Sequence, residues 1–136
     1  MTVRSALLVL GTTLVAAGCG GTTAAVTAPT TSPVTETFAS ILTPQGAATR
    51  IFGTSVAGTL RVTLTSAGPP STVVGLGLGI RDTSGQACQL TSAVNTTAGT
   101  SAQLSAAADA GTYCVRIYDV TGLPEPINFS ITIVHP

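Results

Sequence analysis

The sequence has no tryptophan, no lysine and a single histidine, and aromatic residues make up only 4% of its 136 positions. Charged residues amount to 7%, and five arginines balance five carboxylates, so the formal net charge is zero. A protein that binds nucleic acid needs a cluster of basic side chains to neutralise phosphates. This composition supplies no such cluster, so we expect no nucleic-acid partner.

A hydrophobic run long enough to span a bilayer is also absent after Cys19. The longest apolar run lies before that residue, over Ser5–Ala17, and follows a positively charged start at Arg4. With about 13 residues, this run has the length of the central region of an export signal and is too short for a transmembrane helix. The sequence therefore predicts an exported protein.

The export signal ends in a short motif, Leu14–Cys19, which reads Leu-Val-Ala-Ala-Gly-Cys. The motif resembles the lipobox of bacterial lipoproteins, with Ala16 where that family most often has leucine. The resemblance implies that residues 1–18 are removed as a lipoprotein signal peptide and that fatty-acyl chains are attached to Cys19. Each buried CH₂ of such a chain contributes about 0.8 kcal/mol, so two or more chains hold a protein on a membrane. The alternative is an ordinary secretory signal, in which Cys19 has no special role.

Residues 19–35 are rich in threonine, alanine and proline and contain neither a charge nor an aromatic ring. Such a segment cannot bury enough apolar surface to offset the entropy that it would lose on ordering. Pro29 and Pro33 favour an extended backbone of about 3 Å per residue. We predict a flexible tether that spaces the following domain, residues 36–136, from the membrane.

The domain contains short runs of β-forming residues separated by turn residues. In Thr59–Thr65, for example, Leu60, Val62 and Leu64 alternate with polar side chains, as in a strand with one buried face. Seven or eight such strands without a helical period predict an all-β, antiparallel, two-sheet sandwich of the jelly-roll kind. The expected strands are Thr37–Leu42, Thr49–Val56, Thr59–Thr65, Val73–Asp82, Ala87–Ala93, Ser101–Ala106, Thr112–Tyr118 and Ile127–Val134.

Five segments of this domain carry a second resemblance. They are Arg50–Gly53, Gly58–Thr65, Leu76–Asp82, Ala110–Ile117 and Asn128–Ile133. In order and residue type they resemble the bacterial pre-peptidase C-terminal domain, a jelly-roll-like sandwich found beside secreted enzymes. That family often has acidic residues along the central strand, where this chain has Gly75, Gly77 and Gly79. The chain therefore lacks the acids that would contact a cation or a polar group there.

Cys88 and Cys114 remain as a pair once Cys19 is acylated. In an oxidising compartment an even number of cysteines predicts a disulfide, and two free buried thiols are the alternative. A bond that closes a loop of about 25 residues contributes about 3–4 kcal/mol to the free energy of unfolding. Because side chains alternate along a strand, Cys114 lies on the face opposite Tyr113 and Val115. The bond is therefore expected on the outer face of its sheet or at a sheet edge.

The segment Asp109–Tyr113 is similar to the tyrosine corner of immunoglobulin domains. In that family the cysteine follows the tyrosine by two residues, whereas Cys114 follows Tyr113 directly. A shift of one residue turns a side chain to the other face of the strand, and the sequence has no tryptophan. We therefore do not expect an immunoglobulin domain, and we assign Tyr113 to the core.

Gly75, Gly77 and Gly79 alternate with apolar residues in one expected strand. One interpretation is a flat strip that a sugar ring or a partner backbone approaches closely. The other is close packing of a neighbouring loop or aromatic ring over the glycines. Tyr118 is a candidate for an exposed stacking ring, so these four residues form the candidate binding surface. The glycine spacing lacks the strand–turn–helix context of a dinucleotide-binding loop.

The single histidine, His135, is next to the last residue, where chains commonly fray, so we expect no catalytic triad around it. One histidine and two paired cysteines are too few ligands for a transition metal. Four carboxylates could bind calcium if their loops converged, and turn capping is the interpretation that we favour. They are Asp82, Asp109, Asp119 and Glu125. We therefore expect no cofactor, and calcium stays the open alternative.

Together these patterns predict a lipid-anchored, extracytoplasmic protein of the bacterial cell envelope with a non-catalytic binding or structural module. The expected partners are the membrane, reached through the acyl chains, and a protein or a polysaccharide. One alternative is a small secreted hydrolase that uses Asp or Glu, and another is an architectural surface-coat protein.

Overall fold

The computed structural model describes residues 31–85 and 87–136. The predicted signal peptide, Cys19 and most of the predicted tether lie outside the described residues. Within the described ranges no helix is long and apolar enough to cross a membrane.

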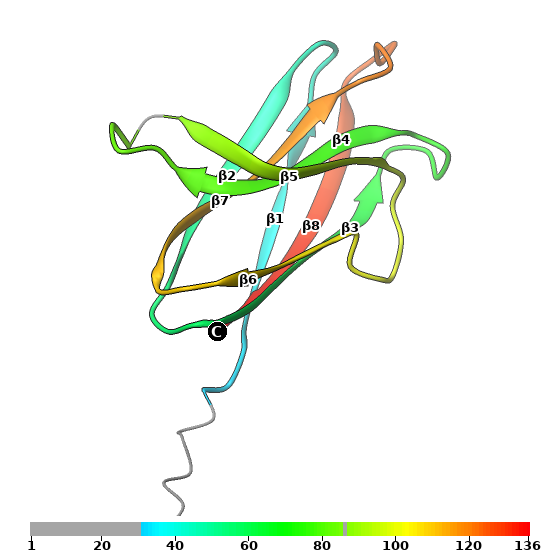
Figure 1. Cartoon of the computed structure of the whole chain (residues 1–136). Coiled ribbons are helices and arrows are strands. Elements are labelled where there is room, and N and C mark those ends of the chain that lie inside the picture. The colour runs from blue at the N-terminus through cyan, green and yellow to red at the C-terminus, as the bar shows by residue number, and fades with distance from the viewer. Residues whose placement is uncertain (1–30, 86) are drawn as a thin grey trace, which may run out of the picture.

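Eight strands make up the described part of the chain (Figure 1). They are β1 (Val34–Leu42), β2 (Ala47–Thr54), β3 (Gly58–Ala67), β4 (Val74–Arg81), β5 (Cys88–Thr96), β6 (Leu104–Ala108), β7 (Gly111–Asp119) and β8 (Ile127–His135). All eight expected strands are present, and most of the differences are at the strand ends. Strand β1 begins at Val34, three residues earlier than expected, because it pairs with β8 along its whole length, from Val34 opposite His135 to Leu42 opposite Ile127.

The strands form two antiparallel four-stranded sheets that face each other (Figure 1). One sheet has the order β1-β8-β3-β6 and the other has the order β2-β7-β4-β5. Most consecutive strands lie in opposite sheets, and β4 and β5 form a hairpin within one sheet. This order is that of an eight-stranded jelly roll. The predicted all-β sandwich is therefore confirmed.

The core lies between the inner faces of the two sheets. Strand β8 shows the expected alternation, with Ile127, Phe129, Ile131 and Ile133 buried. Opposite them, the inner residues of β4 and β7 are almost fully buried, and these include Leu76, Leu78, Val115 and Ile117. Burying one such side chain stabilises the fold by about 1.5–3 kcal/mol, so the alternating aliphatic residues hold the two sheets together.

Candidate functional site

The outer face of the β2-β7-β4-β5 sheet holds the three glycines of β4. Antiparallel pairing places Gly75 opposite Tyr118, Gly77 opposite Arg116 and Gly79 opposite Cys114. Residues that are directly opposite share a sheet face. The sequence groups Tyr118 with the glycines as a candidate binding surface, and in the structure these residues lie on one face of the sheet.

The glycines are nevertheless buried, so the interpretation as an open flat strip is wrong. The ring of Tyr118 lies directly over Gly75, and a Cβ at Gly77 would be 2.6 Å from Cδ1 of Leu90. At Gly79 the backbone of Gln89 and Leu90 covers the strand, with the Leu90 Cα at 2.8 Å from a Cβ placed there. The second interpretation, packing over the glycines, is the one that the structure supports.

Close packing at Gly79 permits the disulfide between Cys88 and Cys114, whose Cα atoms are 5.8 Å apart. Cys88 belongs to β5 and Cys114 to β7, and β4 runs between these two strands. A register shift next to Gly79 lets the start of β5 fold across the outer side of β4. The bond therefore lies on the outer face, as expected, and Cys114 is fully buried beneath it.

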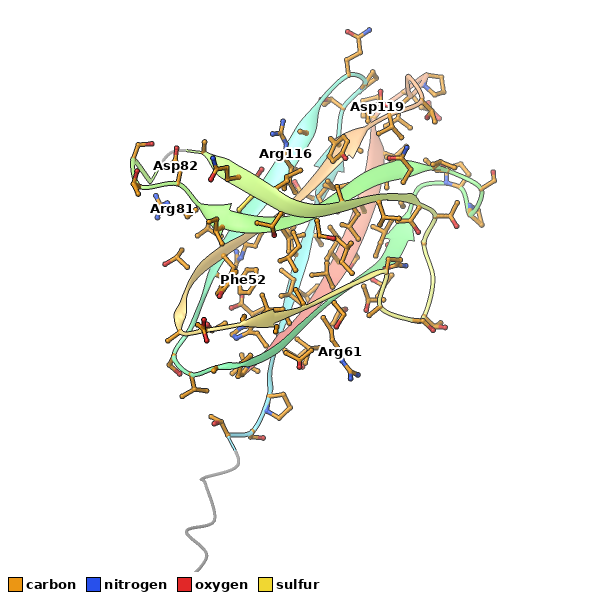
Figure 2. All side chains as sticks on the ribbon, viewed as in Figure 1. Phe52, Arg61, Arg81, Asp82, Arg116 and Asp119 are labelled. Atoms are coloured by element: carbon orange, nitrogen blue, oxygen red, sulfur yellow. A yellow bond between two sulfur atoms is a disulfide. The ribbon has the colours of Figure 1, made fainter. Side chains whose placement is uncertain are left out.

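A surface hollow of about 480 Å³, here called the outer hollow, lies beside this covered row. Tyr118 and Leu90 contribute walls, and the exposed Arg116 lies two positions before Tyr118 on the same face of β7. Figure 2 shows Arg116 on this sheet, Asp119 at the end of β7 and Arg61 on the other sheet. The residues that line the outer hollow are Gln45, Gly46, Ala47, Leu90, Arg116, Tyr118 and Asp119.

The outer hollow lies at the end of the sandwich that is remote from the start of β1. Its rim includes the turn between β1 and β2, which follows Leu42, and the last residues of β7. Val34, where the described chain enters β1, pairs with His135 at the other end of both strands. In Figure 1 the chain accordingly enters at the bottom of the view and the β1–β2 turn is at the top.

Asp119 holds the rim of the outer hollow together. Its carboxylate accepts hydrogen bonds from the backbone N–H groups of Gln45 (2.8 Å), Leu123 (2.9 Å), Thr121 (3.0 Å) and Gly122 (2.9 Å). These donors, with Gln45 first, hold the pKa of Asp119 below its ordinary value of 3.8, because they favour the charged form. The carboxylate therefore organises two turns, as capping predicts.

Arg116 is the second charged group of the outer hollow. Within residues 31–85 and 87–136, Glu36 forms an ion pair with Arg50 and also contacts the His135 ring, and neither interaction includes Arg116. Arg81 is also engaged, because its Nε donates to the carbonyl oxygen of Gly85 at 2.6 Å. The guanidinium of Arg116 thus remains available to a ligand.

A second hollow, here called the edge pocket, has a volume of about 470 Å³ and opens between β6 and the β4–β5 hairpin. Leu60 and Leu78 line its inner part, and the small residues of β6 line one side. Tyr113 is half-buried at this pocket and donates its hydroxyl to the carbonyl oxygen of Asp109 at 3.0 Å. The centroid of this ring is 6.1 Å from that of Phe52, so Tyr113, which was assigned to the core, is partly buried and packs against the core from its edge.

His135 is 4% exposed, so the expectation of a frayed terminal histidine is wrong. Strand β8 continues to this residue because its partner β1 begins opposite it, and a paired terminal strand is held in place. The ring lies 5.2 Å from that of Phe52, and its Nε2 is 3.3 Å from Oε1 of Glu36. Glu36 also pairs with Arg50 at 3.2 Å, which links the two sheets at this end.

The four carboxylates considered for calcium lie in three parts of the fold: Asp82 follows β4, Asp109 lies between β6 and β7, and Asp119 and Glu125 border the β7–β8 loop. Asp82 accepts from the hydroxyl of Ser84 at 2.8 Å and from the N–H of Ala87 at 3.2 Å, so it caps a turn as Asp119 does. Asp109 lines the edge pocket, and Glu125 is exposed in the loop before β8. No group of three or more potential metal ligands comes together in the described ranges.

Sequence reasoning did not identify Arg116, Leu90 or the β1–β2 turn as parts of one surface. Arg116 alternates outward next to Tyr118 in the same strand, and this signal was present in the sequence. Leu90 reaches the site only through the register of β5 on β4, which the sequence pattern does not specify.

No protein-family model matches this chain, and no curated protein matches it.

Proposed function

We propose that this protein is a bacterial lipoprotein of the cell envelope whose β-sandwich is a non-catalytic binding module. In this proposal, acyl chains on Cys19 hold the protein on its membrane and the outer hollow binds a polysaccharide, with a protein partner as the alternative. The disulfide between Cys88 and Cys114 supports an extracytoplasmic location, because such bonds persist in oxidising compartments. The resemblance to pre-peptidase C-terminal domains supports a module that works at the cell surface.

The outer hollow is the observation that carries this proposal. Its volume of about 480 Å³ falls within the usual range of ligand sites. It places an aromatic ring, an aliphatic side chain and a guanidinium on a rigid sheet, and tyrosine and arginine dominate the energetics of many binding surfaces. The ring of Tyr118 rests against Gly75, so it is already positioned before a ligand arrives.

The positions of the carboxylates favour binding over hydrolysis. A glycosidase needs two carboxyl groups on either side of the bond that it cleaves. Each hollow has one carboxylate in its lining, Asp109 in the edge pocket and Asp119 in the outer hollow. Asp119 already accepts four backbone hydrogen bonds, so it serves the turns rather than proton transfer.

Substitution of Tyr118 tests the proposed binding site. We expect the full chain, purified in a nonionic detergent, to bind polysaccharides on a glycan array. Tyr118→Ala should weaken this binding about 2- to 13-fold, because a ring contact contributes about 0.5–1.5 kcal/mol. Tyr118→Phe keeps the ring and should bind nearly as well as the parent.

Thermal unfolding of both variants shows whether weaker binding comes from the missing ring contact or from loss of the folded structure. If Tyr118→Ala folds normally and binds as tightly as the parent, the outer hollow is not the binding site. Release of new reducing ends from a bound glycan would favour the hydrolase alternative. Extensive self-association on vesicles, without glycan binding, would favour a surface-coat protein.

A further inference from the structure

We infer that the outer hollow selects an acidic sugar, whose carboxylate pairs with Arg116 while its ring stacks on Tyr118. This inference deepens the proposed function and rests on it, because it names the class of polysaccharide that the same site takes. A polymer of uronic acid residues is the chemistry that matches both side chains.

The spacing of the two side chains suits one sugar residue. Arg116 and Tyr118 are two positions apart on the outer face of β7, which separates their Cα atoms by about 7 Å. Arg116 lies opposite Gly77, so no side chain of β4 stands directly beside the guanidinium. A ring stacked on Tyr118 can therefore direct an attached carboxylate toward Arg116.

The outer hollow offers an anionic ligand one accessible positive charge, the guanidinium of Arg116. Asp119, the other charged residue of the lining, has its carboxylate oxygens turned to four backbone N–H groups. Arg116 is exposed and has no ion pair within the described residues. A guanidinium binds a carboxylate through two parallel hydrogen bonds, and this geometry gives stronger recognition than a neutral hydroxyl does.

The rest of the surface does not attract polyanions in a general way. The described part of the chain has four arginines, which are Arg50, Arg61, Arg81 and Arg116, against five carboxylates. Arg50 is paired with Glu36, and Arg81 with the Gly85 carbonyl. Arg61 is exposed on β3 in the opposite sheet, so it offers a matched cation far from the outer hollow (Figure 2).

Affinity electrophoresis tests the inference with defined polymers. The full chain, in nonionic detergent, is run through native gels that contain polygalacturonate or the neutral polymer dextran. We expect retardation by polygalacturonate, weaker at higher salt because the charges are screened. Arg116→Gln should raise the apparent dissociation constant about 10-fold. The control Arg61→Gln removes the same charge from the other sheet and should behave like the parent.

Three results would overturn the inference in different ways. Equal weakening by Arg61→Gln and Arg116→Gln would mean that net charge, rather than the outer hollow, governs retardation. Retardation by dextran that does not depend on Arg116 would leave a glycan-binding module but remove the preference for acidic sugars. No retardation by either polymer, in a protein with an intact disulfide and a normal melting temperature, would remove polysaccharide binding altogether.

Discussion

At the scale of single residues, Gly79 shows how a missing side chain can shape a surface. The backbone of Gln89 lies against this glycine, and the start of β5 can therefore reach across β4 toward β7. The disulfide between Cys88 and Cys114 depends on that approach. The glycine is thus required by the close approach of another backbone rather than by a turn.

Gly79→Ala should destabilise the domain by about 1–3 kcal/mol, which is the usual cost of overpacking. The added Cβ would be 2.8 Å from the Cα of Leu90, and a backbone atom cannot move away without the strand. We expect a lower melting temperature and a larger fraction of free thiol, measured by maleimide labelling under non-reducing conditions.

The matched control is Gly53→Ala in strand β2. A Cβ there would have its nearest neighbour, the Gly111 carbonyl oxygen, at 3.9 Å, which is an ordinary contact. This variant should differ from the parent by less than about 0.5 kcal/mol. If Gly79→Ala is equally stable and fully bonded, our account of the row of glycines is wrong.

At the scale of elements, alternation of apolar and polar residues was enough to find the strands and the sheet faces. Strand β8 illustrates this, since its inward positions from Ile127 to Ile133 all carry large apolar side chains. The pairing of strands was harder to predict, because it depends on contacts between distant segments. The burial of His135 follows from its pairing with Val34, which is about a hundred residues earlier in the chain.

The candidate site was likewise predictable from local sequence pattern only in part. Tyr118 and the glycines could be named from the sequence because each residue type suggests a close contact. To predict that Tyr118 and Leu90 cover those glycines, one would need to know the register of three neighbouring strands. A register shift of one residue would turn these side chains to the other face, so local pattern alone could not place them.

Asp119→Asn should loosen the turns that border the outer hollow. The parent carboxylate uses both oxygens as acceptors, whereas an amide retains one, so two of the four backbone N–H groups lose their partner. We expect a lower melting temperature at pH 7. Glu125→Gln removes the same charge from an exposed loop and should leave the melting temperature unchanged.

The difference between Asp119→Asn and the parent should depend on pH. The pKa of Asp119 is lower in the folded protein than its ordinary value of 3.8, so its stabilising contribution is fully present above that value. The contribution is lost as the pH falls through the folded pKa, and the two melting temperatures should converge there. A constant difference from pH 7 down to strongly acidic pH would contradict this role.

At the scale of the whole molecule, the predicted anchor and the described sandwich can be tested separately. Cys19→Ser removes the thiol that would carry the acyl chains, so the protein should fail to mature or appear in the soluble fraction. Cell fractionation followed by mass spectrometry of the N-terminus measures both outcomes. Each lost chain removes many buried CH₂ groups at about 0.8 kcal/mol each.

The control for the anchor is the double substitution of Cys88→Ser and Cys114→Ser. It removes the disulfide but not the proposed lipid, so the protein should stay with the membrane even if its stability falls. If Cys19→Ser is processed as before and remains bound to the membrane, the proposed anchoring is wrong.

The outer hollow lies at the end of the sandwich opposite the point where the chain enters β1. Strand β1 has 9 residues, and at about 3.3 Å per residue it carries the chain about 30 Å from Val34 to the turn at the rim. A protein attached through Cys19 would be tethered at the end of the sandwich where β1 begins. Tyr118 and Arg116 would lie near the opposite end. The proposed site would then lie at the end of the domain opposite its attachment point, so the tether would not cover it when a polymer binds.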